Sequence, residues 1–274
     1  MAYVRTRLGR LFFEERGEPR RRSDPAIVLL HGLLFDGGMW RGQIEPLSAL
    51  GRVLVFDGPG HGRSERPPRF SMEEHADALV DAFSELGVER AIIVGLSWGG
   101  MVGMRFALQH PARVRGLALL DTSAEAQTLA ERVRYRAFVA LHRRVGLPYG
   151  LFAKEVAPQM FGPRTLTTRP DLALATYRRA MGFDRDGVAK AALAVVVHRK
   201  DILDRIGAIR APALVIVGRE DRATPMDKAS SIAQAIAGAE LVVLDDVGHM
   251  SALEDPDAVN ARLVPFVRGL VGDA

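Results

Sequence analysis

The 274-residue sequence contains no cysteine. Disulfide bonds, thiol nucleophiles and cysteine-ligated metal sites are therefore excluded. No apolar run approaches the roughly 20 residues that a membrane-spanning helix needs, and the start, Met1–Arg7, lacks the apolar core of a secretory signal. We therefore expect a cytoplasmic protein without a membrane partner.

The chain also has no internal repeat and no low-complexity segment, and its net charge of +4 is small for its length. Arginines are scattered and acidic residues are interleaved with them, so no basic patch indicates a nucleic-acid partner. The composition, 48% hydrophobic and 26% charged, is that of a globular protein. This length suits one α/β domain or one domain with a sizeable insertion.

Buried strands and helices alternate along the first half of the sequence. Residues 3–15 predict a hairpin around Gly9. Continuous apolar runs at 26–30, 52–56, 91–95 and 114–120 are typical of strands buried on both faces. Helical patterns separate them, and one begins at the capping box Ser71–Glu74. Repeated strand–helix–strand units predict an α/β fold with a parallel sheet and helices on both faces.

This alternation stops between residues 122 and 210. Helical patterns occur there at 125–145, 149–160, 170–182 and 186–204, and Val195–Val197 lies inside the last of them. Strands resume at 213–217 and 241–244, Thr224-Pro225 predicts a helix start, and a closing helix begins near Pro256. We therefore expect a core of residues 1–121 and 211–274, with residues 122–210 inserted as a helical cap.

The most informative motif is Gly95-Leu96-Ser97-Trp98-Gly99, a G-x-S-x-G sequence between a predicted strand and a predicted helix. Such a turn can hold a serine on a strained corner with its hydroxyl clear of the backbone, and small flanking residues let the turn close. The motif predicts that Ser97 is a nucleophile. The alternative is an ordinary glycine-rich turn.

A serine nucleophile needs a base, and the base needs an orienting acid. His249 follows the last strand, at the sheet edge that also carries Ser97. Asp221 follows strand 213–217 and lies between serine and histidine in chain order. Glu220 and Asp121, which also ends a strand at this edge, are the alternatives to Asp221.

Backbone amides can stabilise a developing oxyanion. We expect these donors to be the N–H groups of Leu33, after the first buried strand, and Trp98, after the nucleophile. His31 is expected to be a structural hydrogen-bonding residue.

Two other patterns were weighed for ligand binding. The glycines of Asp57–Ser64 resemble a phosphate loop, but the lysine is missing, and we expect a tight turn. Asp186, His198, Asp201 and Asp204 lie near Arg199, Lys200 and Arg205 and predict a solvated charged face, so no metal or other cofactor is expected.

Together these motifs resemble the α/β-hydrolase superfamily. The resemblance rests on His31-Gly32, Asp57–Ser64, Gly95–Gly100, Gly218–Asp221 and Gly248-His249, which occur in the family's order from residue 31 to 249. It implies an eight-stranded, mostly parallel sheet with a helical cap after the sixth strand. It also implies that Ser97, Asp221 and His249 are the catalytic triad and that Leu33 and Trp98 supply the oxyanion amides.

The closer resemblance is to cofactor-free carboxylesterases, enol-lactone hydrolases, C–C bond hydrolases and haloperoxidase-like esterases. It implies hydrolysis of a small-molecule ester or lactone through an acyl-enzyme. C–C cleavage, perhydrolysis, and use of the fold as a ligand receptor or regulator are the alternatives. We expect an apolar pocket and either a monomer or a homodimer. The pocket residues we expect are Leu33, Leu34, Trp98, Phe138, Phe152, Phe161 and Met250.

Overall fold

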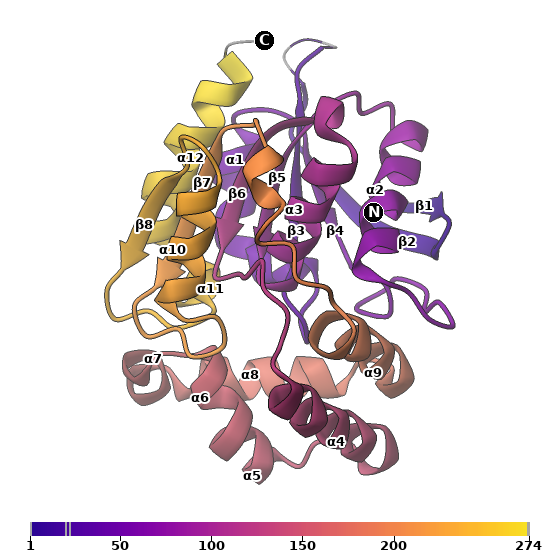
Figure 1. Cartoon of the computed structure of the whole chain (residues 1–274), viewed down its shortest axis with the longest axis vertical. Helices are drawn as coiled ribbons and strands as arrows, with labels where there is room; N and C mark the ends of the chain where they lie inside the picture. Colours follow the sequence, from indigo (N-terminus) through magenta and orange to yellow (C-terminus); the bar gives the residue numbers. More distant parts are fainter. Residues whose placement is uncertain (1, 20, 22, 273–274) are drawn as a thin grey trace.

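The computed structural model describes residues 2–19, 21 and 23–272. Their eight strands form one sheet in the order β1-β2-β4-β3-β5-β6-β7-β8 (Figure 1). The strands are β1 (Ala2–Thr6), β2 (Gly9–Arg16), β3 (Ala26–Leu30), β4 (Val53–Phe56), β5 (Ala91–Leu96), β6 (Val114–Leu120), β7 (Ala213–Gly218) and β8 (Glu240–Leu244). The strands from β3 to β8 run parallel, and β2 is antiparallel to both β1 and β4. The predicted fold class is confirmed.

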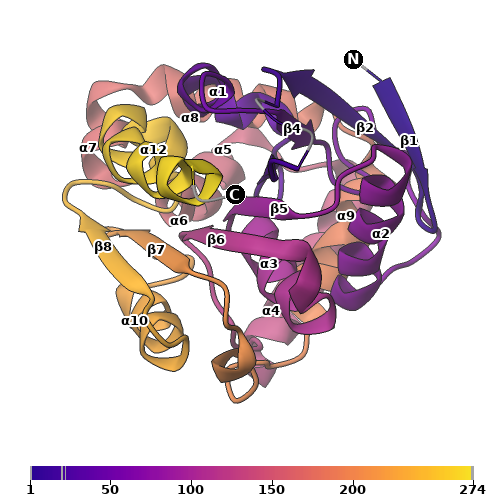
Figure 2. The ribbon, with the colours of Figure 1, turned by 90° about the horizontal axis from the view of Figure 1, so that it is seen from above.

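Helices cover both faces of the sheet (Figure 2). The helices of the core are α1 (Arg41–Ser48), α2 (Met72–Glu85), α3 (Trp98–Gln109), α10 (Met226–Ala235), α11 (Ser251–Glu254) and α12 (Pro256–Gly272). Short 3-10 turns lie at Gly37–Trp40, Pro111–Arg113 and Ile206–Ala208.

Alternate residues of the strands point to opposite faces, so each strand from β3 to β7 contributes to two hydrophobic cores. In β3, Ile27 and Leu29 pack in the core under α1 and α12, whereas Val28 and Leu30 pack in the core with α2 and α3. Burial on both faces explains why these strands appear in the sequence as continuous apolar runs.

The segment between β6 and β7 forms a helical layer at the end of the sheet (Figure 1, below the sheet). This cap consists of α4 (Leu129–Val145), α5 (Tyr149–Leu151), α6 (Ala157–Met160), α7 (Pro163–Thr168), α8 (Pro170–Met181) and α9 (Arg185–Ala192), with π-helical turns at Phe152–Val156 and Leu193–Val197. Its two connections to the core lie side by side, because the amide of Ile202 donates to the carbonyl of Ala124 at 3.0 Å.

Two predicted helix boundaries were wrong. The helix predicted to run to residue 204 ends with the π-helical turn at Val197, and the chain then crosses to pair with the other cap connection. The helix predicted at 125–145 begins at Leu129, where Thr128 and Glu131 form a capping box. Both differences occur at the cap connections, where hydrogen bonds between the two connections replace helical hydrogen bonds.

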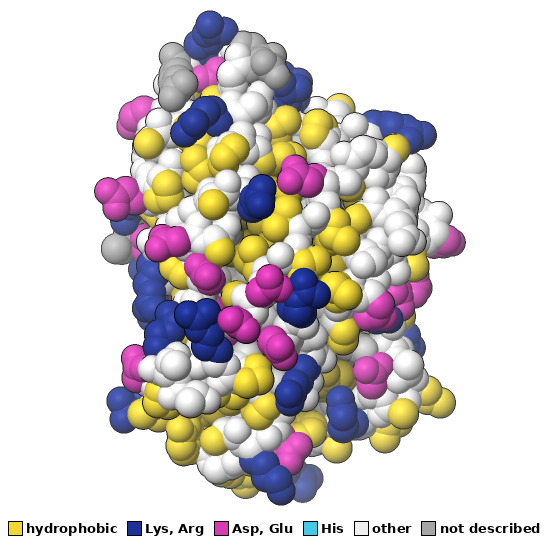
Figure 3. Space-filling view, turned by 90° about the vertical axis from the view of Figure 1, so that its left-hand side faces the viewer, with side chains coloured by type: hydrophobic (Ala, Val, Ile, Leu, Met, Phe, Trp, Pro, Cys, Tyr) yellow, Lys and Arg dark blue, Asp and Glu magenta, His cyan; other side chains and the backbone are white. Residues whose placement is uncertain are grey.

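Charges of both signs are interleaved on the side of the molecule that carries β8 (Figure 3). None of the described helices combines the length and the apolar character needed to cross a membrane.

Candidate active site

Ser97 lies in the turn between β5 and α3, in a backbone conformation (φ 52°, ψ −110°) that side-chain-bearing residues rarely adopt. The two glycines of the motif are required by close backbone packing. A Cβ on Gly99 would lie 2.0 Å from the carbonyl oxygen of Leu30, and one on Gly95 would lie 2.3 Å from the carbonyl carbon of Gly99. The spacing of the glycines therefore follows from how tightly strand and helix meet.

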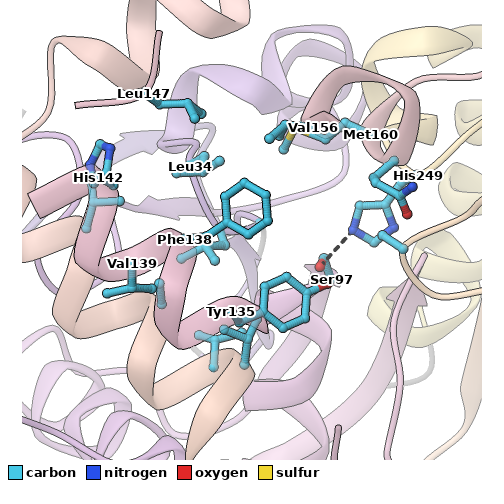
Figure 4. A pocket seen from close by; sticks show the side chains of 18 of the residues that line it. Leu34, Ser97, Tyr135, Phe138, Val139, His142, Leu147, Val156, Met160 and His249 are labelled. Atoms are coloured by element: carbon cyan, nitrogen blue, oxygen red, sulfur yellow. Dashed lines mark hydrogen bonds between the residues drawn. The ribbon is translucent and has the colours of Figure 1, made fainter. Parts of the chain in front are cut away.

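A chain of hydrogen bonds connects Ser97 to His249 and Asp221. Nε2 of His249 lies 2.9 Å from Oγ of Ser97 (Figure 4), and Nδ1 lies 2.8 Å from Oδ2 of Asp221. Because an ionised carboxylate only accepts hydrogen bonds, Nδ1 carries the proton and Nε2 is free to accept the serine proton. This is the arrangement of a nucleophile, a general base and an orienting acid.

Asp221 is fixed by its own loop. The amides of Ala223 and Thr224 donate to Oδ1 at 2.8 and 2.9 Å, and the hydroxyl of Thr224 donates to Oδ2 at 2.8 Å. A helix does start after the predicted Thr224-Pro225, at Met226, but the hydroxyl of Thr224 binds Asp221 and does not cap α10. The polar groups of this loop therefore hold the carboxylate of Asp221 and do not cap the helix that follows.

The two alternative acids are placed differently. Oδ1 of Asp121 accepts from the amide of Gly218 at 2.9 Å, and Oδ2 accepts from the amide and hydroxyl of Ser251. Asp121 thus joins the ends of β6 and β7 to α11 and makes no hydrogen bond to His249. Glu220 is held through its backbone amide by the carbonyl of Val247, and its side chain is not hydrogen-bonded to His249.

Electrostatics in this buried cluster favour a basic imidazole. Burial lowers the pKa of His249, but the charge and hydrogen bond of Asp221, followed by the charges of Asp121 and Glu254, outweigh it and raise the pKa above 6.5. Burial and then the charge of Asp221 raise the pKa of Asp121. Asp221 is therefore the carboxylate that contributes most to raising the pKa of His249.

The amides of Leu33 and Trp98 make no hydrogen bond to any other described residue. Trp98 is the first residue of α3, where helix geometry leaves the N–H without a partner in the helix. The indole of Trp98 is buried away from the site, between the rings of His31, His61 and His75. Two backbone donors are thus available near Ser97.

Buried histidines hold the loop that carries Leu33. Nε2 of His61 accepts from the amide of Leu34 at 3.2 Å, and Nε2 of His31 accepts from the amide of Gly58 at 2.7 Å, which leaves Nδ1 of His31 to donate to the carbonyl of Gly32. Burial lowers the pKa of His61 to about 3, so its ring is neutral. His31, in the loop after β3, and His61, in the turn after β4, therefore hold the backbone around the site in place.

A cavity of about 290 Å³ lies between the core and the cap and reaches Ser97 and His249 (Figure 4). Its wall includes Leu33, Leu34, Phe138 and Met250 of the expected set. Phe152 and Phe161, also expected there, do not line it. Phe152 packs against Tyr177 of α8 with ring centroids 5.2 Å apart, and both phenylalanines are buried in the core under α1 and α12. The side chain of Trp98 also lies outside the wall.

Comparison with known proteins identifies the family. A model of the alpha/beta hydrolase fold matches residues 25–256. The chain belongs to the α/β-hydrolase family. Two solved structures resemble this hydrolase over nearly its whole length, each with 30% sequence identity. A thermophilic esterase from Thermogutta terrifontis has a TM-score of 0.90 and 98% coverage of both chains. The enol-lactonase from Burkholderia xenovorans has a TM-score of 0.88, with 97% of this chain and 99% of that chain covered.

A relative of another kind is also similar. The dihydrolipoyllysine-residue acetyltransferase component of the acetoin cleaving system from Pseudomonas putida is 30% identical over 267 residues, which cover 95% of this chain and 67% of that protein. Among the described residues of this hydrolase, no group of three or more histidine, aspartate or glutamate side chains is placed to hold a metal ion.

Sequence reasoning missed Glu254, which connects the cap of this hydrolase to the loop that carries His249. One carboxylate oxygen accepts from the amides of Gly248 and Met250 at 3.0 and 3.2 Å, and the other accepts from the amide of Gly162 in the cap at 2.8 Å. Burial raises the pKa of Glu254. No motif marks this residue, because its partners are backbone amides that any sequence could supply.

Sequence reasoning also misplaced Arg199. The charged face predicted around it is exposed at His198, Lys200 and Asp201, but Arg199 itself is 5% exposed and lines the cavity. The turn after Val197 breaks the helical spacing on which that prediction depended.

Proposed function

We propose that this hydrolase cleaves a carboxylic ester or a lactone through an acyl-enzyme on Ser97. The observation that carries the proposal is the hydrogen-bonded series from Ser97 through His249 to Asp221, with two amides beside it that have no hydrogen-bond partner among the described residues. The 30% identity to an esterase and to an enol-lactonase supports the same class of substrate.

The reaction begins with attack of Ser97 on the substrate carbonyl carbon. Nε2 of His249 accepts the serine proton as the bond forms, and Asp221 stabilises the resulting imidazolium. The amides of Leu33 and Trp98 donate to the oxyanion of the tetrahedral intermediate.

The ester bond then breaks, and the imidazolium of His249 donates its proton to the leaving oxygen. A water molecule attacks the acyl-enzyme while His249 accepts its proton, and the serine hydroxyl is restored with release of a carboxylic acid. With a lactone, the leaving oxygen stays attached to the acyl chain, so the product is a hydroxy acid.

The test is a pair of serine variants. Ser97→Ala removes the nucleophile and is expected to lower kcat for a p-nitrophenyl ester about 10⁴-fold or more. It should also abolish labelling by a fluorophosphonate probe. Ser84→Ala is the control, since the Ser84 hydroxyl only donates to the Val80 carbonyl on the surface of α2, and should match the wild type in both assays.

Three outcomes would contradict the proposal. Ester hydrolysis by Ser97→Ala at the wild-type rate would show that Ser97 is not the nucleophile. A wild-type protein that neither reacts with the probe nor turns over esters, lactones, a vinylogous diketone or peroxide would favour a ligand receptor on this fold. Turnover of the diketone or of peroxide in preference to esters and lactones would instead identify a C–C hydrolase or a perhydrolase that uses the same residues.

A further inference from the structure

We infer that the substrate carries a carboxylate besides the bond that is cleaved, and that the guanidinium of Arg199 binds this carboxylate inside the cavity. The inference rests on the proposed function, since it concerns the substrate of the same site. It names the substrate class as half-esters of dicarboxylic acids and carboxylate-bearing lactones.

The guanidinium of Arg199 is fixed between the first connection of the cap and the π-helical turn that ends the cap. Nε donates to the carbonyl of Glu125 at 2.8 Å, and Nη1 donates to the carbonyl of Val195 at 3.0 Å. Both acceptors are neutral backbone groups. The second terminal nitrogen, Nη2, makes no hydrogen bond to any described residue, and the side chain lines the cavity. One edge of a rigidly held guanidinium is therefore left for a ligand.

No described carboxylate forms an ion pair with Arg199. The acidic side chains on the neighbouring elements already have partners. Glu131 of α4 caps its own helix through Thr128, Glu125 pairs with Lys228, and Glu73 pairs with Arg105. The cation thus faces the cavity without an ion pair to any described carboxylate, and the charge of Glu131 only partly offsets the effects that lower its pKa.

A buried cation without a hydrogen-bonded carboxylate partner is unfavourable, and the protein keeps this one charged. Burial, and then the charge of Arg105, lower the pKa of Arg199 to about 10, so the guanidinium remains protonated at neutral pH. A carboxylate ligand would supply the missing charge, and its two oxygens match the planar N–H groups of a guanidinium.

The other charged groups of the cavity wall leave it positive. Arg134 of α4 is exposed and forms no ion pair with a described residue, and Glu155 is the single acidic side chain in the described wall. Burial, and then the charge of Arg185, lower the pKa of His142, so this histidine is neutral at pH 7. Two arginines against one glutamate favour an anionic ligand over a cationic one.

The test compares two p-nitrophenyl esters of the same length, the neutral pentanoate and the anionic half-ester of glutaric acid. The wild type is expected to have the higher kcat/KM for the anionic ester. Arg199→Gln should lower the ratio of the two kcat/KM values about 10- to 100-fold, as expected for a charge-assisted hydrogen-bonded pair, mainly through the KM of the anionic ester. Arg199→Lys should restore part of the ratio.

Arg205→Gln is the matched control, because it removes an exposed positive charge from the same cap connection outside the cavity wall. It should leave the ratio within about twofold, since long-range charge effects in solution are screened. Glutarate should also inhibit the wild type competitively, and more weakly the Arg199→Gln variant.

The possible outcomes separate the role of Arg199 from the proposed ester hydrolysis. Equal kcat/KM values for the two esters, or an unchanged ratio in Arg199→Gln, would overturn the role of Arg199 while ester hydrolysis stands. An equal loss for both esters in Arg199→Gln and Arg199→Lys would show that Arg199 only joins the first cap connection to the π-helical turn. A wild-type protein that is not labelled by the probe and hydrolyses no ester would instead reject the proposed function.

Discussion

His249 contacts one carboxylate and lies near another, and the two act on it differently. Asp221 accepts the hydrogen bond from Nδ1, whereas Asp121 is turned toward Gly218 and Ser251. Both raise the pKa of His249, and Asp221 does so more strongly. A residue that orients the imidazole can therefore be separated experimentally from one that only contributes charge.

The pH dependence of kcat/KM should reflect this difference. General-base catalysis needs neutral His249, so the rate should increase with pH with an apparent pKa above 6.5, and a rate that is flat from pH 5 to 8 would contradict a histidine base. Asp221→Asn should move this increase to lower pH and reduce the plateau about 10³- to 10⁴-fold.

The control for Asp221→Asn is Asp121→Asn. It should shift the profile slightly in the same direction and reduce the plateau less than about tenfold. An equal loss in the two variants would identify Asp121 as a second orienting acid. Stopped assays over pH 5–9 with a substrate whose product absorbs at all these values give the comparison.

At the scale of elements, the turn between β5 and α3 allows a test of backbone packing. Gly99→Ala would place a Cβ against the carbonyl of Leu30. Because both contacting groups belong to the backbone, the clash cannot be relieved by rotating a side chain. We expect the free energy of unfolding to fall by about 3 kcal/mol or more.

The control is Gly269→Ala, which is exposed in α12 with no atom near the added Cβ. This variant should gain up to about 1 kcal/mol, because alanine favours a helix more than glycine does. Urea unfolding curves measure both. A Gly99→Ala protein as stable as the wild type would show that the turn can open.

The sheet and the turn were predictable because their signals are local. Apolar runs marked β3 to β7, and the glycine spacing marked the turn at Ser97. The cap was harder to predict, because its last helical turn ends at Val197, where the chain leaves to pair with the other cap connection. Phe152, Glu254 and Arg199 were misplaced or missed because their neighbours come from distant parts of the sequence, which periodicity within one helix does not report.

At the scale of the whole molecule, the cap contacts the loops that surround the site. Arg179 of α8 pairs with Asp36, which lies just after the loop that carries Leu33, with Nε of Arg179 2.6 Å from Oδ2 of Asp36. Asp36 is buried. Glu254 makes the corresponding connection from the cap to the loop of His249. The cap therefore braces both loops as well as walling the cavity.

Arg179→Ala should destabilise the protein because it leaves the buried carboxylate of Asp36 without its cation. We expect a loss of about 1–3 kcal/mol in the free energy of unfolding. Arg66→Ala is the control, since its pair with Asp184 also joins core to cap but both side chains are half exposed, and it should cost less than about 1 kcal/mol. Equal losses in urea unfolding would contradict the role of burial.

The adjacent ends of the cap have an evolutionary consequence. The cap leaves the core near Ala124 and returns near Ile202, and these two residues are hydrogen-bonded to each other. An insertion of another length or shape can therefore occupy this place without displacing β6 or β7. The sheet can thus retain its chemistry while the inserted segment diversifies. Descendants of one ancestral gene could acquire new substrates through changes confined to this module.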